Sequence, residues 1–373
     1  MSASGAIIRA RRVNALYVLA IRLDSPRSGR SHWHHTLLYL YIYQYLAGLC
    51  IDDKYSNNGL YTLGGIHVVS SYRVRFIVGP NRGRFPYSNC LLLESAMASI
   101  LVDSGCGAQN LTAVKDGINA VIYTHYHPDH ISGHHMLGRV RVYAPEGEMP
   151  YKSLEDLARR FASTHYKEWM EFAMSYVGVK TVPIADEYYK PGEDVCIRDV
   201  CIKTIPAPGH LKTHTILELS GSHIHLTDID LTSFGPWYAN PESDPLQFIA
   251  DIDLALSLDA RLYTTSHKEE EFSPDKAREA LVRYSYRIFE VAWSIYNSIG
   301  PGEEVTGWNL AGRGVVYRRY APGIERLMKY FEAMMIDKLL PILHAVGCIE
   351  RRRKGYVKRG CSMSDLKILV RVG

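Results

Sequence analysis

The sequence predicts an α/β layered fold, in which strands and helices alternate along the chain. Three observations support this class. Short apolar runs separated by turn residues dominate the chain after about residue 60. Stretches with helical periodicity stand between several of these runs. Polar side chains that can bind metals follow directly after some of the apolar runs, and the order strand, polar site, helix, strand is typical of a layered α/β fold.

Size and composition indicate an ordinary globular protein. Of the 373 residues, 47% are hydrophobic and 22% are charged, and the formal net charge is +4. A chain of this length can bury one large core and has room for a smaller second region. The small net charge does not by itself indicate nucleic acid binding. Basic residues gather in "ERRRKGYVKRG", residues 350–360, where a solvated surface is the expected role.

The seven cysteines are scattered and contain no C-x-x-C pair. Their spacing predicts neither a disulfide framework nor a structural zinc knuckle. The expected setting is therefore reducing and cytoplasmic.

Residues 1–60 are expected to form a peripheral extension. The apolar run Leu37–Ile51 has 15 residues, whereas a membrane span needs about 20, and no clear signal-peptide cleavage site follows it. An extra helix packed on the domain, a weak membrane anchor and sequence upstream of the true start remain open. No firm membrane association is expected.

The pattern of apolar runs and turn residues predicts the following elements after residue 60. Residues 64–79 alternate as paired strands would, and residues 90–95 with 99–105 resemble a hairpin. Residues 119–124 indicate a buried strand. Further strands are expected at 195–210, 214–221, 222–231 and 261–267, helices within 111–118, 153–178, 250–260, 274–300 and 325–347, and a small hairpin at 348–360.

The densest group of polar donors is "THYHPDHISG", residues 124–133. It holds His125, His127, Asp129 and His130 in the pattern H-x-H-x-D-H, directly after the expected buried strand. His125 and His127 are two residues apart, so in an extended segment their side chains point the same way. Asp129 and His130 reach a second position only if the chain turns at Pro128, a residue type that favours such a turn.

Three later strands also end in a good metal donor. "TIPAPGH" ends at His210, "HIHLTD" at Asp228 and "LYTTSH" at His267. Strand ends hold side chains at fixed positions while the adjoining loops open to solvent. Imidazole and carboxylate ligands suit zinc or iron, so these residues are expected to meet the histidine cluster at a metal site.

In this order, the segments resemble the metallo-β-lactamase superfamily. The H-x-H-x-D-H motif is preceded by "LVDSG", with Asp103, and followed by "APGH", "LTD" and "TSH", so that the resemblance spans about residues 60–270. It implies an αββα sandwich as a catalytic domain at residues 61–273. An extra segment, residues 1–60, precedes that domain, and a helical, winged-helix-like tail, residues 274–373, follows it.

The resemblance also implies a binuclear site with two divalent metal ions, Zn²⁺ first and Fe or Mn as alternatives. Around the first ion it places His125, His127 and His210, around the second Asp129, His130 and His267, with Asp228 bridging both. Asp230 is the alternative bridging residue. The sequence departs from the family pattern at Thr227, which replaces the usual glycine before the bridging aspartate. His214 is expected behind the ligands, and Asp103 is expected to buttress a ligand loop.

The implied activity is metal-dependent hydrolysis by a metal-bridging hydroxide, with Asp129 orienting the hydroxide or shuttling its proton. Similarity to glyoxalase II-like hydrolases favours an ester, a thioester or a related small molecule. Phe234, Trp237 and Tyr238 line a pocket or pack a loop, and both interpretations stay open. The alternatives are an RNA-processing hydrolase of the same superfamily and a mononuclear iron persulfide dioxygenase. Nucleic acid is disfavoured because no RNA-binding motif is found, and a homodimer is left open.

Overall fold

The computed structural model describes the backbone of residues 8–13, 16–21, 60–63 and 66–69, and the backbone and side chains of residues 71–362. The chain divides into two units, Met1–Asn57 and Asn58–Gly373. The second unit contains every expected ligand, and it is described first.

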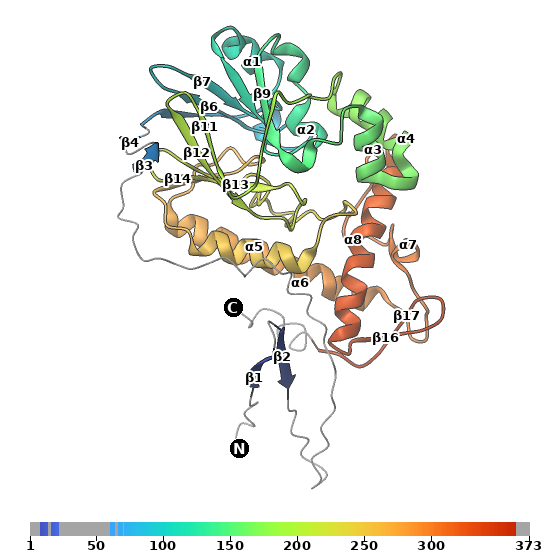
Figure 1. Ribbon diagram of the computed structural model, residues 1–373. Helices are drawn as coiled ribbons and strands as arrows, with labels where there is room; N and C mark the ends of the chain where they lie inside the picture. Colours follow the sequence, from blue (N-terminus) through green and yellow to red (C-terminus); the bar gives the residue numbers. More distant parts are fainter. Residues whose placement is uncertain (1–7, 14–15, 22–59, 64–65, 70, 363–373) are drawn as a thin grey trace. The chain divides into compact units, whose positions relative to one another are not determined.

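A six-stranded mixed sheet forms the first half of this unit (Figure 1). Its order is β10 (Glu187–Tyr189), β9 (Arg141–Pro145), β8 (Ala120–Ile122), β7 (Ser99–Val102), β6 (Cys90–Glu94) and β5 (Arg73–Ile77). The strands β5, β6 and β7 pair antiparallel, and β7 to β10 pair parallel. The hairpin expected from residues 90–105 is confirmed as β6 and β7.

A five-stranded sheet forms the second half. Its order is β11 (Asp194–Ile197), β12 (Val200–Pro206), β13 (Thr215–Leu219), β14 (His223–His225) and β15 (Leu262–Thr264). The strands β11 to β14 pair antiparallel and β15 joins parallel to β14.

The two sheets pack face to face through alternate side chains of their strands. From the first sheet Leu91, Leu93 and Val102 belong to the same buried cluster as Ile202 and Leu217 of the second. The residues between them, such as Leu92 and Leu101, belong to another cluster that includes helical residues. Because successive side chains of a strand point to opposite faces, both faces of the first sheet are buried, and the predicted αββα sandwich is confirmed.

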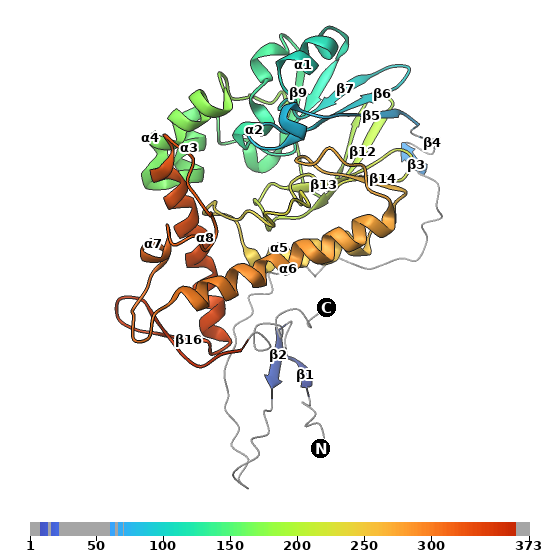
Figure 2. The ribbon, with the colours of Figure 1, turned by 180° about the vertical axis from the view of Figure 1, so that it is seen from behind.

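Helices cover the outer faces, as Figures 1 and 2 show for α5 and α6 along the second sheet. The helices are α1 (Ala108–Val114), α2 (Pro128–Ile131), α3 (Leu154–Ala162), α4 (Tyr166–Phe172), α5 (Pro245–Ser257), α6 (Pro274–Ser298), α7 (Gly307–Leu310) and α8 (Glu325–Ala345). A π-helical turn, Ala173–Val177, continues α4. Local sequence explains several starts: Ser153 and Asp156 form a capping box on α3, and Asp244 caps α5 before Pro245.

Three two-stranded hairpins complete the described elements. They are β1 (Ile8–Val13) with β2 (Leu16–Ile21), β3 (Leu60–Leu63) with β4 (Ile66–Val69), and β16 (Ile349–Arg351) with β17 (Tyr356–Lys358). The expected pairing within residues 64–79 is wrong, because β4 pairs with β3 and β5 pairs with β6. Alternation predicts a strand but not its partner, since partners are set by the register of both strands. The apolar run Leu37–Ile51 lies outside the described residues.

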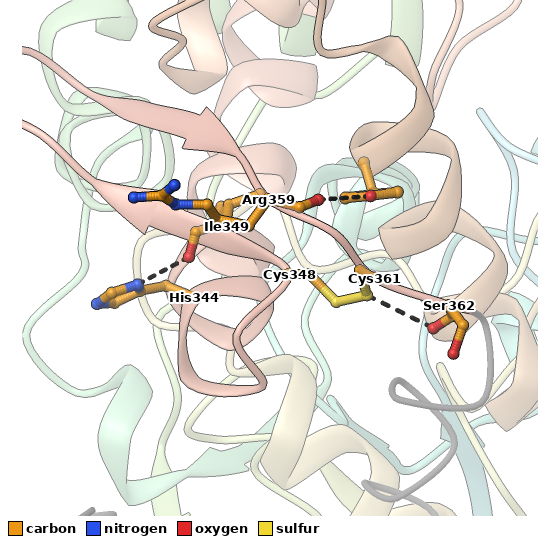
Figure 3. The surroundings of a disulfide bond; sticks show 7 residues. His344, Cys348, Ile349, Arg359, Cys361 and Ser362 are labelled. Atoms are coloured by element: carbon orange, nitrogen blue, oxygen red, sulfur yellow. Dashed lines mark hydrogen bonds between the residues drawn. A yellow bond between two sulfur atoms is a disulfide. The ribbon is translucent and has the colours of Figure 1, made fainter. Parts of the chain in front are cut away.

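Two cysteine pairs are joined, so the expectation that the cysteines form no disulfides is wrong. Cys196 and Cys201 are cross-strand partners in the β11–β12 hairpin and form one disulfide. Cys348 and Cys361 form the other at the base of the β16–β17 hairpin, close to the hydrogen bond from His344 Nδ1 to the carbonyl of Ile349 (3.0 Å; Figure 3). Sequence spacing did not reveal the Cys196–Cys201 pair because the register of the β11–β12 hairpin creates it. The cysteine argument for a reducing compartment loses its basis.

In the C-terminal region, the buried carboxylate of Glu332, on α8, orders the segment after α7. It accepts hydrogen bonds from the backbone N–H groups of Gly312 (2.8 Å), Val316 (3.0 Å) and Tyr317 (3.3 Å), and from the hydroxyl of Tyr320. Glu332 is 0% exposed. A buried carboxylate is tolerated when its lone pairs are satisfied in this way, so Glu332 fixes a loop that carries Tyr317 toward the site described below.

Within the described part of the chain, no helix is long and apolar enough to span a membrane.

Replacing Glu332 with alanine is expected to lower the free energy of unfolding by about 2–4 kcal/mol, because three backbone N–H groups and one hydroxyl lose their acceptor. Denaturant unfolding of the full chain measures this loss. Glu325→Ala, at an exposed position of the same helix, serves as the control and is expected to change stability by less than about 1 kcal/mol. Equal stability of the two variants would contradict the role given to Glu332.

Deleting residues 1–57 is expected to leave a folded protein that keeps its metal-binding capacity. Both sheets, their buried core and all expected ligands belong to the second unit. Circular dichroism and metal analysis of the shortened protein check this. Loss of the cooperative unfolding transition would show that the first unit is integral to the core.

Candidate metal centre

Five of the seven expected ligands come from loops that follow strands of the two sheets. His125 and His127 follow β8, His210 follows β12, Asp228 follows β14 and His267 follows β15. The remaining two, Asp129 and His130, lie in α2, whose first residue is Pro128. The chain therefore turns at the predicted proline and sends Asp129 and His130 away from the extended pair before them. All seven side chains are buried, none more than 8% exposed.

Four of these residues form the first group of donors: His125, His127, His210 and Asp228. His127 Nδ1 lies 2.9 Å from His125 Nε2 and 2.9 Å from His210 Nε2. Oδ2 of Asp228 lies 3.2 Å from His210 Nε2 and 3.7 Å from His125 Nε2. Tetrahedral ligands of zinc at bond lengths near 2.0–2.1 Å are about 3.3 Å apart, so one cation fits among these atoms.

The other three residues form an adjoining group: Asp129, His130 and His267. Nε2 of His267 lies 3.2 Å from Asp129 Oδ2, and Nε2 of His130 lies 3.7 Å from that oxygen. The second oxygen of Asp228, Oδ1, lies 3.0 Å from His130 Nε2 and 3.6 Å from His267 Nε2. Asp228 therefore directs one carboxylate oxygen to each group.

The donors present fit two cations. Nε2 of His130 and Oδ1 of Asp228 lie 3.0 Å apart, but both atoms are buried and neither makes a hydrogen bond. Such an arrangement is costly unless a cation binds these atoms. Burial and neighbouring histidines hold the pKa of His125 well below its ordinary value, and burial does the same to His127. Both rings are thus neutral, the form of imidazole that binds metals.

In the second donor group, carboxylates raise the pKa values of the histidines. Burial lowers the pKa of His130 and of His267, but the carboxylate of Asp228 and its acidic neighbours outweigh burial and raise both values. Burial alone would raise the pKa of Asp228. His130 and His267 outweigh burial and hold this pKa well below its usual value. The buried negative charge therefore requires positive charge beside it, which a divalent cation supplies.

Backbone and carboxylate acceptors fix the ligand rings from behind. Nδ1 of His210 donates to the carbonyl of Trp237 (3.0 Å), and Nδ1 of His267 donates to the carbonyl of Gly83 (3.1 Å). Nδ1 of His130 donates to Asp103 Oδ2 (2.8 Å). Each bond leaves the lone pair of Nε2 directed into the site.

Asp103 buttresses the ligand loop, as predicted. Besides His130, its carboxylate accepts the backbone N–H (2.9 Å) and the hydroxyl (2.8 Å) of Thr124, next to the first ligand His125. It makes these bonds from a left-handed backbone conformation with φ of 58°.

His214 lies behind Asp228, as predicted, and is not a member of either donor group. Its Nδ1 donates to the carbonyl of Ala207 (2.8 Å), and its Nε2 accepts the backbone N–H of Asp228 (3.0 Å). Thr227, the residue before Asp228, adopts φ of 50°. That region is unfavourable for a β-branched residue, and the hydroxyl of Thr227 compensates by bonding the carbonyl of Thr215 (2.7 Å).

Asp228, not Asp230, reaches the histidines. Oδ1 of Asp230 instead accepts the backbone N–H of Thr232 (2.9 Å), and burial raises the pKa of Asp230. Asp230 lines the neighbouring cavity without joining a donor group. The geometry therefore favours Asp228 over Asp230 as the shared carboxylate.

A support from the C-terminal helices was missed in the sequence. The amide of Asn240 approaches His127 Nε2 to 2.6 Å, and the hydroxyl of Ser243 donates to the carbonyl of His210 (2.6 Å). Lys338, on α8, donates to the carbonyls of both Asn240 and Ser243. Burial lowers the pKa of Lys338 to about 8. No sequence pattern marks Lys338, because its partners are backbone atoms about 95 residues away.

A cavity of about 740 Å³ opens beside the two groups and is lined by His127, Asp129, His210, Asp228 and His267. Phe234 and Trp237 also line it, so the pocket interpretation holds for these two rings. Tyr238 does not and is 1% exposed, so the packing interpretation holds there. The wall also includes rings that were missed in the sequence, namely Phe85, Trp169, Phe172, Tyr176, Tyr317 and Phe331. The basic hairpin residues 350–359 do not line this cavity.

Comparison with known proteins agrees with this fold. The sequence profile of the metallo-beta-lactamase superfamily matches residues 83–221. A metallo-beta-lactamase family protein from Thermus thermophilus aligns over 77% of this chain and 98% of its own, with 17% identity and a TM-score of 0.57. A beta-lactamase domain protein from Burkholderia ambifaria aligns over 83% and 96%, with 16% identity and a TM-score of 0.53.

None of the curated proteins compared with the chain matches it. The profile match covers the H-x-H-x-D-H segment and His210, and the two solved structures share the layered fold around it. Residues 83–221 therefore resemble the metallo-beta-lactamase superfamily in sequence, and the chain shares the fold of the two solved structures.

Proposed function

We propose that the protein is a binuclear metal-dependent hydrolase that acts on an ester, a thioester or a related small molecule. The observation that carries this proposal is the pair of adjoining donor groups that share Asp228. A complete second group, with Asp129, His130 and His267, supports two ions rather than one, and so favours hydrolysis over a mononuclear iron dioxygenase. Zinc is the first expectation because imidazole and carboxylate ligands suit it, with iron or manganese as alternatives.

When bound, two divalent ions supply Lewis acidity and lower the pKa of a coordinated water. The chain itself supplies position and proton handling. Asp129 faces the cavity and the second donor group at once, so it can orient an attacking water and accept its proton. Asn240 lines the same cavity beside His127 and offers a polar contact to a substrate. The buried setting of the ligands strengthens these electrostatic contacts.

The shape and charge of the cavity support a small-molecule substrate. A volume of about 740 Å³ is in the range of small-molecule pockets, roughly 300–1,000 Å³. Arg82, Arg84 and Lys268 line the cavity, and two of these three basic side chains are paired with acidic residues: Arg82 with Glu269, and Lys268 with Glu270 (3.1 Å). Such pairing weakens attraction for a polyanion such as RNA. The homodimer stays a prediction from the sequence, and the cytoplasmic location stays untested without its argument from the cysteines.

Replacing His127 or Asp228 with alanine is expected to lower kcat/KM by more than about 100-fold, because each supplies a donor atom to the first group. Steady-state kinetics on a panel of esters and thioesters measures the loss, and circular dichroism checks the fold. His135→Ala is the matched control, since this exposed histidine follows the same motif but belongs to neither group. Wild-type kinetics in His127→Ala would overturn the ligand assignment.

The purified protein is expected to carry close to two equivalents of divalent metal, because each donor group fits one cation. Elemental analysis by mass spectrometry measures the content. Chelation is expected to abolish hydrolysis, and addition of zinc is expected to restore it. One equivalent of iron, with oxygen consumption in place of hydrolysis, would favour the dioxygenase instead.

A further inference from the structure

The cavity beside the donor groups has one wall that the proposed chemistry does not use. Three segments far apart in the sequence build it: the loop at Phe85, the helix α4 with its π-helical turn, and the start of α8. The first two contribute Phe85, Trp169, Phe172 and Tyr176. The start of α8 contributes four apolar residues, Ile324, Leu327, Met328 and Phe331.

Three rings of this wall stack on one another. The centroid of Phe85 lies 5.7 Å from that of Phe172 and 6.2 Å from that of Tyr176, and the centroids of Phe172 and Tyr176 are 5.6 Å apart. The ring planes differ by 12–20°. Such offset stacks form a continuous apolar surface.

Two members of the stack are open to solvent. Phe85 is 44% exposed and Tyr176 is 46% exposed. Core packing therefore does not account for the stack, and a grouped, exposed apolar surface in a concave site is typical of a ligand contact. His127 and Asp228 line the same cavity, so a molecule held at the donor groups can also reach this wall.

We propose that the substrate is an ester or thioester with a large apolar group next to its scissile bond, and that this group packs on the wall formed by Phe85, Phe172, Tyr176 and the start of α8. This inference rests on the proposed hydrolysis and names its substrate class. In the reaction, the water oxygen bonds to the carbonyl carbon, the C–O or C–S bond breaks, and the proton goes to the leaving group. The apolar group belongs to the acyl part or to the leaving group, and the two arms of the test distinguish these.

The test uses the zinc-loaded full chain with two series of substrates. One series lengthens a straight acyl chain from two to ten carbons on a fixed leaving group, and the other lengthens the alcohol or thiol on a fixed acetyl group. In one arm kcat/KM is expected to rise about fourfold for each methylene that the wall covers, the equivalent of ~0.8 kcal/mol. Flat profiles in both arms, with measurable hydrolysis of the shortest substrate, would overturn the inference and leave the proposed function standing. No metal-dependent hydrolysis of any ester or thioester would overturn both.

A pair of variants tests the wall itself. Tyr176→Glu places a charge on the stack and is expected to lower kcat/KM for the longest substrate about tenfold or more, because an apolar group then packs against a carboxylate. The shortest substrate is expected to change less than about twofold. Met174→Glu is the matched control: Met174 lies in the same π-helical turn, is 49% exposed and does not line the cavity. Equal effects of the two variants on the longest substrate would contradict the inference.

A binding measurement gives a readout that does not depend on turnover. Calorimetric titration with decanoate and with acetate compares a long and a short carboxylate on the same zinc-loaded protein. Decanoate is expected to bind more tightly than acetate by at least tenfold, and Tyr176→Glu, but not Met174→Glu, is expected to remove this difference. The same measurement with a ten-carbon alcohol covers the other arm. Equal affinities for long and short ligands in both classes would show that the wall holds no apolar group.

Discussion

The carboxylate of Asp228 is the interaction on which the site depends. It lies buried between two sets of histidines, with one oxygen toward each. A buried carboxylate is stable only where positive charge and donors surround it, so the loops after β8, β12 and β15 must converge on the loop after β14. The two sheets, packed through Leu91, Ile202 and their neighbours, hold these loops together. The fold and the candidate metal centre therefore both require these four loops to meet.

Behind the ligands, the rings of His130, His210 and His267 are each fixed by an acceptor from another part of the fold. Gly83 and Trp237 provide carbonyl groups and Asp103 provides a carboxylate. His214 fixes Asp228 in turn through its backbone N–H, with Thr227 held in an unfavourable conformation beside it. This second layer sets the tautomers of His130, His210 and His267, and so makes their Nε2 atoms available together.

The candidate ligands could be proposed from the sequence because the features that mark them are local. Histidine and aspartate types, their spacing in residues 125–130, and their position after apolar strands all appear in the one-dimensional pattern. The strands at 64–79 were predicted, but their partners were not, because pairing depends on register with distant strands. The Cys196–Cys201 disulfide was missed for the same reason. The stacked rings of Phe85 and Phe172 come from unrelated segments, and no periodicity joins them.

Lys338 and the start of α8 tie the C-terminal helices to the metal centre. Lys338 holds the carbonyls of Asn240 and Ser243, which contact His127 and His210, while Leu327 and Phe331 of the same helix line the cavity. The domain boundary expected near residue 273 therefore does not separate the residues that form the site from the C-terminal helices. A chimera that joined these sheets to the C-terminal helices of a relative would alter ligand geometry and selectivity together. The C-terminal region therefore cannot be exchanged as an independent module that changes only one of these two properties.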